Sequence, residues 1–456
     1  MDYQDFLKLK QDYGANSGFD PLFMPDFLFD FQVALTEWVI KKGRGAIFAD
    51  CGMGKTPMQL VWAENVVRKT NKPVLILTPL AVSGQTLDEA KKFSIEAHRA
   101  TIGNNPTAIQ VTNYEKLHHF DSSRYGGVVC DESSILKNFD GTRKAQITEF
   151  MRRVPYRLLC TATAAPNDWV ELGTSSEALG YLGYTDMISK FFTNKSNTVA
   201  TRKFQHQREK FRLRGYAERD FWKWVSSWAR AARHPADLGF DNDGFILPPL
   251  IENDIIVEAS RLRDGMLFEL PAMSFHEERE ASRRTIADRC EAAADRVADH
   301  DVSMVWCNLN DEGSLLKHII PNSVEISGSD SDEVKEEAAR WFCHGKEEKR
   351  VLISKSQIFG FGLNFQHAHH TTYFPTHSYE RYYQATRRFW RFGQQYPVIV
   401  DRVYTKGTER MLQNLDRKAK AADKMFDKLV RYMYEGSKVE NVYTHKETEV
   451  PQWLKM

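Results

Sequence analysis

The alternation of apolar and polar positions along the chain predicts strands and helices in a regular order. Short apolar runs predict four buried strands in the first region, at residues 46–49, 74–78, 128–131 and 157–161. The stretches between them favour helices, at residues 58–69, 84–93 and 142–153. A strand that is apolar at nearly every position is covered on both faces, as in a parallel sheet. Functional loops are then expected at the carboxyl ends of these strands.

A second region with the same alternation begins near residue 255. Its apolar runs predict strands at residues 304–307, 324–326, 351–354, 371–374 and 398–403. A charged helical stretch is predicted at residues 277–299, and a further charged helix at residues 408–435. Between the two regions the alternation is lost, and the chain becomes basic and aromatic.

We therefore expect an α/β fold of two tandem parallel-sheet domains with a helical, basic insertion between them. The predicted units are a first lobe at residues 1–190, an insertion and linker at 191–250, a second lobe at 251–410, and a C-terminal helix and tail at 411–456.

The composition changes this picture little. Of 456 residues, 42% are hydrophobic and 27% charged, which is ordinary for a globular chain of two or three domains. No apolar stretch approaches the roughly 20 residues of a membrane span. The N-terminus is acidic and lacks the layout of an export signal, so we expect a cytoplasmic protein without membrane contact. Six dispersed cysteines, with no Cys-x-x-Cys pair, indicate reduced core thiols rather than disulfides or a zinc site.

The most informative polar segment, A-D-C-G-M-G-K-T at residues 49–56, lies between a predicted strand and a predicted helix. In such a loop the backbone N–H groups and the helix N-terminus surround phosphates, a lysine reaches the β- and γ-phosphates, and a Thr hydroxyl binds Mg²⁺. The residues expected to bind the nucleotide here are Gly52, Met53, Gly54, Lys55 and Thr56. A tight turn into a helix would also explain the glycines, but it requires neither the lysine nor the threonine.

An acidic pair, Asp131 and Glu132, follows the strand predicted at residues 128–131. An aspartate at a strand end can hold Mg²⁺ through water, and an adjacent glutamate can polarise the water that attacks the γ-phosphate. Solvated Asp-Glu pairs are common, so the pair gains its meaning from the phosphate loop before it. Together the two segments predict an ATPase that uses ATP and Mg²⁺.

The second region has no phosphate loop of its own, but it carries Arg388 and Arg391 in the segment 384–394. On a helix these two side chains would lie one turn apart and face the same way. Such a pair can reach across a cleft and stabilise the charge that develops on the γ-phosphate. The alternative is a solvated basic helix face.

The segment 202–233 contains ten Lys and Arg residues against three acids, with seven aromatic residues between them. A basic, aromatic segment suits a phosphate backbone, and we expect Arg212 and Arg214 to bind nucleic acid. The alternative is an amphipathic helix whose aromatic stripe belongs to the core. The four-residue spacing of Trp224 and Trp228 favours that alternative for the aromatic residues.

Taken together, these segments resemble the motifs of superfamily 2 helicases, and among them the Swi/Snf-type DNA-dependent ATPases. The resemblance covers roughly residues 27–410 and rests on Phe31-Gln32 and on residues 49–56, 77–80, 111–115, 131–138, 161–167, 326–329, 360–364 and 384–394. Residues 131–138, 166–168 and 239–245 also resemble compact helicase-like proteins of bacteriophages and prophages. Three positions depart from the family pattern: Ser134 and Trp390 replace histidines, and Ala164 replaces a proline.

The resemblance implies two RecA-like lobes with ATP and Mg²⁺ between them. Gln32 would then read adenine, and Gly362 would lie in a loop near the nucleotide. Nucleic acid would cross both lobes, through contacts that the motifs place at Thr78, Asn113, Thr163 and Ser356.

The predicted function is thus an ATP-dependent DNA translocase or helicase, which couples ATP hydrolysis to movement on duplex or branched DNA, or to its remodelling, in phage or prophage DNA metabolism. Relatives of the Swi/Snf type usually track along duplex DNA without separating the strands, which favours translocation here. We expect a monomer that could also bind a protein partner. The alternative function is a partner-dependent ATPase subunit of a DNA-modification or transcription complex.

Overall fold

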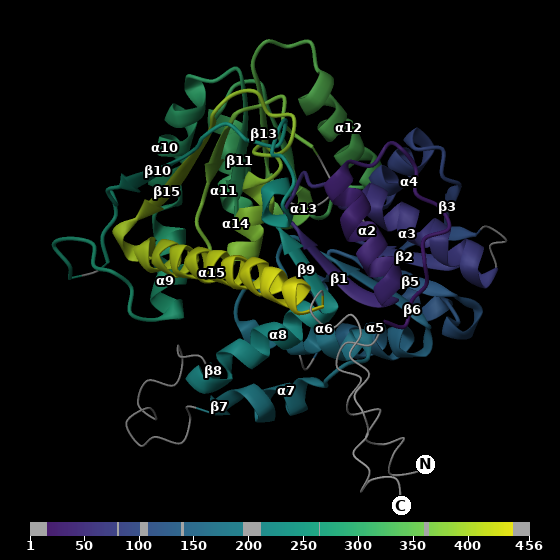
Figure 1. Cartoon of the computed structure of the whole chain (residues 1–456). Coiled ribbons are helices and arrows are strands. Elements are labelled where there is room, and N and C mark those ends of the chain that lie inside the picture. The colour runs from purple at the N-terminus through teal and green to yellow at the C-terminus, as the bar shows by residue number, and fades with distance from the viewer. Residues whose placement is uncertain are drawn as a thin grey trace, which may run out of the picture.

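The computed structural model describes residues 16–79, 82–100, 108–137, 141–194, 211–263, 265–359 and 364–440. Two parallel β-sheets, each covered by helices, form two lobes that lie side by side (Figure 1). The predicted α/β architecture of two parallel-sheet domains is confirmed.

The first lobe is built on a seven-stranded parallel sheet, with helices on both faces. Its strands are, in spatial order, β3 (Ala97–Arg99), β4 (Ile109–Asn113), β2 (Val74–Thr78), β5 (Gly127–Asp131), β6 (Tyr156–Cys160), β1 (Arg44–Ala49) and β9 (Ala229–Ala232). Its helices are α2 (Asp30–Lys42), α3 (Lys55–Thr70), α4 (Ser83–Lys92), α5 (Thr142–Arg153), α6 (Leu172–Leu179), α7 (Tyr184–Phe191) and α8 (Glu218–Trp228). Helices α2 and α3 contribute to one apolar core, whereas α5, α6 and α8 contribute to another.

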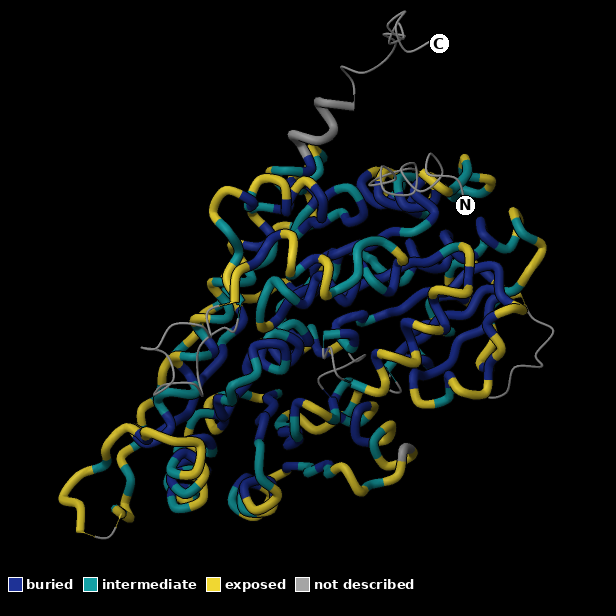
Figure 2. The backbone as a smooth tube through the Cα atoms, turned by 90° about the horizontal axis from the view of Figure 1, so that it is seen from below, coloured by how far each residue is buried: buried dark blue, intermediate teal, exposed yellow. Residues whose placement is uncertain are grey.

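The second lobe has a six-stranded parallel sheet. Its strands are, in spatial order, β10 (Leu250–Val257), β15 (Val398–Thr405), β14 (His370–Tyr373), β11 (Val302–Cys307), β13 (Arg350–Lys355) and β12 (Ser323–Ile326). Its helices are α9 (Phe275–Arg284), α10 (Ile286–Ala298), α11 (Asn310–Ile319), α12 (Asp332–His344), α13 (Ser356–Phe359), α14 (Tyr379–Thr386) and α15 (Glu409–Glu440). Figure 2 shows that the buried backbone is concentrated in the interior of the molecule and the exposed backbone in the outer loops.

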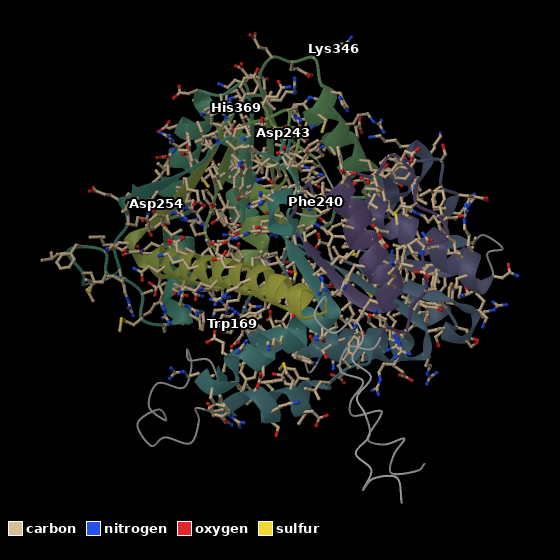
Figure 3. The ribbon with its side chains drawn as sticks, in the orientation of Figure 1. Trp169, Phe240, Asp243, Asp254, Lys346 and His369 are labelled. Carbon is tan, nitrogen blue, oxygen red and sulfur yellow. The ribbon has the colours of Figure 1, made fainter. Side chains whose placement is uncertain are left out.

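The segment between the lobes is more closely joined to the first lobe than its sequence indicates. A short antiparallel pair, β7 (Phe192–Asn194) with β8 (Phe211–Leu213), precedes α8, and β9 then pairs in parallel with β1. The sequence of β9 is Ala-Arg-Ala-Ala, which has no strand propensity to detect. This strand therefore forms because β1 offers it an open edge. Figure 3 labels Phe240 and Asp243 of the linker that follows, near the boundary between the lobes.

The aromatic residues of α8 belong to the core of the first lobe. Trp222, Trp224 and Trp228 are buried, so the interpretation of this stripe as an amphipathic helix face is confirmed. Arg230 is one of the ten basic residues of the segment 202–233. Its guanidinium carbon lies 4.3 Å from the centroid of the Trp38 ring. The six cysteines are all free thiols, and four of them are buried.

The last described helix, α15, joins the two lobes (Figure 1). Leu415 near its start packs into the core of the second lobe, whereas Leu429 and Met433 pack into the core of the first. Among the residues that the structure describes, no helix combines the length and the apolar character needed to cross a membrane.

Candidate active site

The loop between β1 and α3 depends on two glycines in the left-handed region of backbone conformation. Gly52 has φ of 89° and Gly54 has φ of 74°, values that side chains disfavour. A Cβ atom at Gly54 would also lie 2.1 Å from Gln32 Nε2, and one at Gly52 would lie 2.9 Å from the backbone nitrogen of Phe392. The loop can therefore close around an anion only with glycine at both positions.

Lys55 begins α3 and projects into this loop. Its Nζ donates to the carbonyl oxygens of Ala49 at 2.9 Å and Asp50 at 3.2 Å. An ammonium group has three N–H donors, so one donor is still available to a phosphate oxygen. Together with the N-terminus of α3, this side chain makes the loop electropositive.

Asp131 and Glu132 lie at the carboxyl end of β5, beside the phosphate loop. Asp131 Oδ1 accepts from Gln59 Nε2 at 2.7 Å, and its carbonyl oxygen accepts from the Tyr114 hydroxyl at 2.5 Å. Glu132 has φ of 52°, although it is not a glycine, and its Oε2 accepts from Thr161 Oγ1 at 3.2 Å. A strained backbone of this kind persists only where its surroundings hold it, which is common at functional sites.

Burial dominates the protonation of this acidic pair. It raises the pKa of both Asp131 and Glu132, and the nearby Lys55 ammonium opposes that rise in each case. A bound divalent cation would add to the effect of Lys55 and favour the ionised carboxylates. Thr56 and Asp131 both line the cavity beside the loop. They fit Mg²⁺, which takes one or two protein oxygens and completes its shell with phosphates and water.

Arg388 and Arg391 line the same cavity as Lys55, but they do not lie on the helix that the sequence predicts. Helix α14 ends at Thr386, and both arginines lie in the turns that follow. The cavity between the lobes has a volume of about 580 Å³, within the range of small-molecule sites. Burial lowers the pKa of Arg388 to about 10, which leaves its guanidinium charged at neutral pH.

Helix α14 and Arg387, which follows it, join the second lobe to the carboxyl edge of the first sheet. Arg387 pairs with Asp50 at 2.5 Å, Tyr383 donates to the same carboxylate, and Lys137 pairs with Glu380. Gln384 Nε2 lies 3.4 Å from Glu132 Oε2, so a residue of the second lobe reaches the acidic pair directly. The spacing of residues 380, 383, 384 and 387 is that of one helix face.

An aromatic cluster borders the cavity and was not predicted. Phe29 lies before α2, Phe245 belongs to the linker, and Phe392 follows α14. The ring centroids of Phe245 and Phe392 are 4.7 Å apart, and those of Phe29 and Phe245 are 5.3 Å apart. The cluster combines three segments that are far apart in the sequence. The phenylalanines near Gln32 were the one local signal for it, and they indicate only the contribution of the first segment.

Gln32 lies beneath this cluster, with its side-chain amide bound to the protein. Its Nε2 donates to the Met53 carbonyl at 3.0 Å, and its Oε1 accepts from the Phe29 backbone at 3.1 Å. Met53 itself is buried. The glutamine therefore links α2 to the phosphate loop, at a place where an adenine ring could lie.

Most residues predicted to bind nucleic acid lie within the protein. Thr78 is fully buried with its hydroxyl 2.8 Å from that of Ser83, and Asn113 Oδ1 caps the following turn by accepting from the Lys116 backbone. Thr163 and Ser356 are also buried, and Thr163 lines an inner cavity between the lobes. A contact between these four residues and nucleic acid stays a prediction.

The other two predicted residues lie on an open surface. Arg212 and Arg214 line a hollow of about 570 Å³ between the β7–β8 pair and α15. Gly362 lies outside the described residues.

Comparison of the sequence with protein-family models and with curated proteins gives no match. Many solved structures are similar to this one, among them the following two. The SWI2/SNF2 ATPase core of Sulfolobus solfataricus in complex with dsDNA shares 16% identity over 88% of this chain and 93% of its own, with a TM-score of 0.40. Helicase Lhr of Mycobacterium smegmatis, bound to ssDNA and AMP-PNP, shares 13% identity over 85% of this chain, with a TM-score of 0.50.

The chain has the α/β fold of two RecA-like domains that the sequence predicts. Its two parallel sheets are the two RecA-like domains expected of that fold, and this chain covers 48% of the Lhr chain. Within the shared fold, the cavity at residues 52–56 opens between the two domains. A shared fold does not fix the chemistry, which depends on the side chains that line the cavity.

Proposed function

We propose that this protein is an ATP-hydrolysing motor that moves along DNA or remodels it. One observation supports this most: the phosphate loop, the acidic pair and the two arginines of the second lobe line one cavity between two RecA-like domains. The alternatives for the separate segments, a solvated acidic pair and a solvated basic helix face, would not bring these residues into one cavity.

In this proposal each side chain has one task. Lys55 and the loop amides bind the triphosphate, and Thr56 and Asp131 hold Mg²⁺, which supplies charge neutralisation at the phosphates. Glu132 orients the attacking water, with Thr161 and Gln384 fixing its carboxylate. Arg388 and Arg391 stabilise the charge that develops on the γ-phosphoryl group.

The contacts of α14 connect hydrolysis to movement. Asp50 of the phosphate loop and Glu132 both contact α14, so a change at the phosphates would alter how firmly the second lobe is held. A motor needs such a coupling between the state of its nucleotide and the closure of its lobes. We propose DNA as the track, with Arg212 and Arg214 among its phosphate contacts, and the role in phage DNA metabolism stays a prediction.

The deciding experiment measures ATP hydrolysis by the purified chain with single-stranded, duplex, forked and four-way DNA, and with RNA. We expect hydrolysis to rise with DNA and to be lost in Lys55→Ala. Equal rates with and without nucleic acid would refute the motor. Stimulation by a protein partner alone would establish the second candidate, a partner-dependent ATPase subunit.

A further inference from the structure

The second lobe carries a loop with an unusual share of exposed apolar side chains, at residues 265–275. Leu267 is 92% exposed and Met273 84% exposed, and four more large apolar side chains of the loop are also exposed: Met266, Phe268, Leu270 and Phe275. Single exposed apolar residues are ordinary, whereas six within eleven positions indicate a contact surface. The loop projects from the second lobe, at the left of Figure 1 and the lower left of Figure 2.

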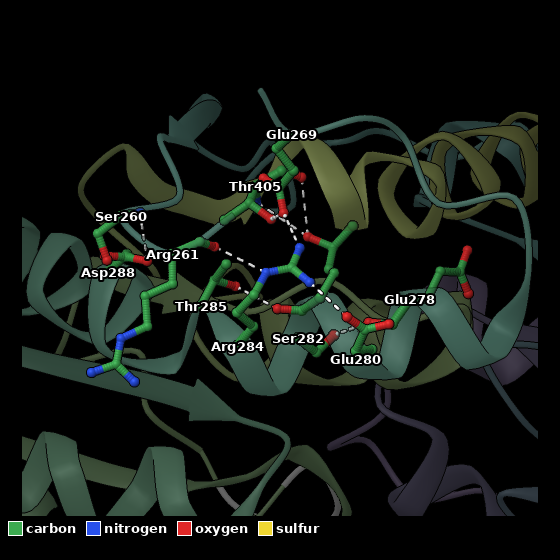
Figure 4. A network of polar contacts seen from close by, with 12 residues as sticks. Ser260, Arg261, Glu269, Glu278, Glu280, Ser282, Arg284, Thr285, Asp288 and Thr405 are labelled. Carbon is green, nitrogen blue, oxygen red and sulfur yellow. Dashed lines mark hydrogen bonds and ion pairs between the residues drawn. The ribbon is translucent and has the colours of Figure 1, made fainter. Parts of the chain in front are cut away.

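The base of this loop is held by polar contacts (Figure 4). Arg284 of α9 donates to the Arg261 carbonyl at 2.9 Å and to Glu269 Oε1 at 3.3 Å. The same Glu269 oxygen accepts from Thr405 Oγ1 at 3.4 Å, at the end of β15. On the other side of the loop, Arg410 donates to the Met273 carbonyl at 2.9 Å. The loop is therefore anchored at Glu269 and at the Met273 carbonyl, while its large apolar side chains stay exposed.

Cationic side chains follow the loop on α9, one and two helical turns after Phe275. Arg279 and Arg283 are exposed, lie four residues apart on α9, and make no ion pair among the described residues. The acids of α9 are already engaged: Glu277 with Arg263, Glu278 with His377, and Glu280 with Arg284. The face of α9 that carries these two arginines therefore attracts anions.

These arginines also line a cavity of about 290 Å³ at the carboxyl edge of the second sheet. Its other walls include Asn308 after β11, Phe374 after β14 and Thr408 after β15. In the sheet β11 lies beside β14, and the strand order changes direction between these two strands. Ligands of parallel α/β sheets bind at this edge and at such a reversal.

We propose that the loop at residues 265–275 is a wedge that inserts apolar side chains between DNA bases while Arg279 and Arg283 hold the adjacent phosphates. The proposal rests on the proposed function and names its substrate. Leu, Met and Phe are the side chains that proteins insert between base steps, and the paired cations match a phosphate backbone. Unstacking costs least where bases are already unpaired, so the substrate is a fork or branch rather than uniform duplex.

The test uses the full chain without nucleotide and a forked DNA that carries 2-aminopurine at its junction. Insertion should raise the 2-aminopurine fluorescence, and Leu267→Ser with Phe268→Ser should abolish that rise without changing DNA affinity. Ile256→Ser is the matched control, because this side chain is 60% exposed on β10 of the same lobe. Its fluorescence rise should equal that of the wild type, and thermal melting should confirm that all variants fold.

A second variant tests the cations. Arg279→Gln with Arg283→Gln should flatten the slope of log affinity against log salt by about 1.8, because each phosphate contact contributes about 0.9. An unchanged slope would overturn the phosphate contacts.

Two results would overturn the wedge itself. One is an equal fluorescence rise in the Leu267→Ser, Phe268→Ser variant. The other is the absence of any fluorescence rise in the wild type. Self-association or binding to anionic vesicles through the loop would then identify a different occupant. Failure of the proposed function would appear separately, as ATP hydrolysis that DNA does not stimulate, because the fluorescence is measured without hydrolysis.

Discussion

Arg387 of the second lobe forms an ion pair of 2.5 Å with Asp50 of the phosphate loop, and the pair is largely buried. The Arg387 guanidinium also lies over the Trp390 ring at 4.1 Å and the Tyr383 ring at 5.2 Å. A single side chain is thus fixed by charge and by stacking at the boundary between the lobes. It transmits the position of α14 to the loop that would bind the triphosphate.

The first prediction concerns this pair. Asp50→Asn and Arg387→Gln should each lower kcat/KM for ATP, because either change leaves a buried partner uncompensated and loosens lobe closure. The two changes should be non-additive, with a coupling free energy of about 1–3 kcal/mol in a double-mutant cycle of steady-state ATP hydrolysis. Arg68→Gln, which removes a surface pair with Glu64 in α3, is the control and should change little. Additive effects of the two changes would show that the pair does not act as a unit.

The second prediction concerns Glu132. Glu132→Gln should retain ATP binding, because the amide has the same shape and the Thr161 hydroxyl can still contact it. Turnover should fall about 10³-fold, the usual contribution of a residue that handles the attacking water. Fluorescent-nucleotide binding and single-turnover hydrolysis separate the two steps. Glu115→Gln on the surface is the control, and a Glu132→Gln enzyme with normal turnover would remove Glu132 from the mechanism.

The third prediction concerns pH. Because burial raises the pKa of Glu132, its carboxylate becomes protonated at a higher pH than an exposed glutamate. The ionised form is the one that orients water, so kcat/KM should fall as pH is lowered through that raised pKa. The acid limb of the pH profile should therefore lie above the usual glutamate range. An acid limb at or below that range would contradict the assignment.

The fourth prediction concerns the aromatic cluster. Phe245→Ala should raise KM for ATP about 30-fold with a smaller effect on kcat, since base stacking on an aromatic ring contributes about 2 kcal/mol. Phe240→Ala is the control, because this linker ring packs against the first lobe and does not line the cavity. KM values for ATP and GTP, measured side by side, report the effect. An unchanged KM in Phe245→Ala would exclude the cluster from base binding.

The fifth prediction concerns stability, through Asp401 in the sheet of the second lobe. Burial raises the pKa of Asp401, but hydrogen bonds from His370, Arg296 and Asn253 outweigh it and hold the pKa below its usual range. Asp401→Asn should lower the free energy of unfolding by about 3 kcal/mol at neutral pH, because it leaves the buried partners without their anion.

The sign of the pH effect follows from that depressed pKa. The stabilisation by Asp401 is fully present above the pKa of an unfolded aspartate and is lost as pH falls through the lower pKa of the folded state. Urea unfolding at a series of pH values should show the wild type and Asp401→Asn converging in acid. Asp295→Asn, an exposed acid on α10, is the control, and a pH-independent difference for Asp401→Asn would refute the assignment.

The amino-acid sequence alone predicts the two lobes, and it carries the local signals for the phosphate loop and the acidic pair. These features are local: apolar runs reveal parallel strands, and residues 52–56 and 131–132 carry their chemistry in consecutive positions. The sequence also predicts that Arg388 and Arg391 face the nucleotide. It places them on a helix, whereas they lie in the turns that follow α14.

Contacts between segments that are distant in the sequence are visible only in the folded chain. The strand at Ala229–Ala232 has no local signal and exists because β1 offers an edge, and α15 joins both cores through side chains that are far from them in sequence. The Asp50–Arg387 pair and the aromatic cluster each unite residues from different lobes, and the apolar loop is recognised only by its exposure. Burial and contact across hundreds of residues depend on how elements pack, which periodicity and spacing do not encode.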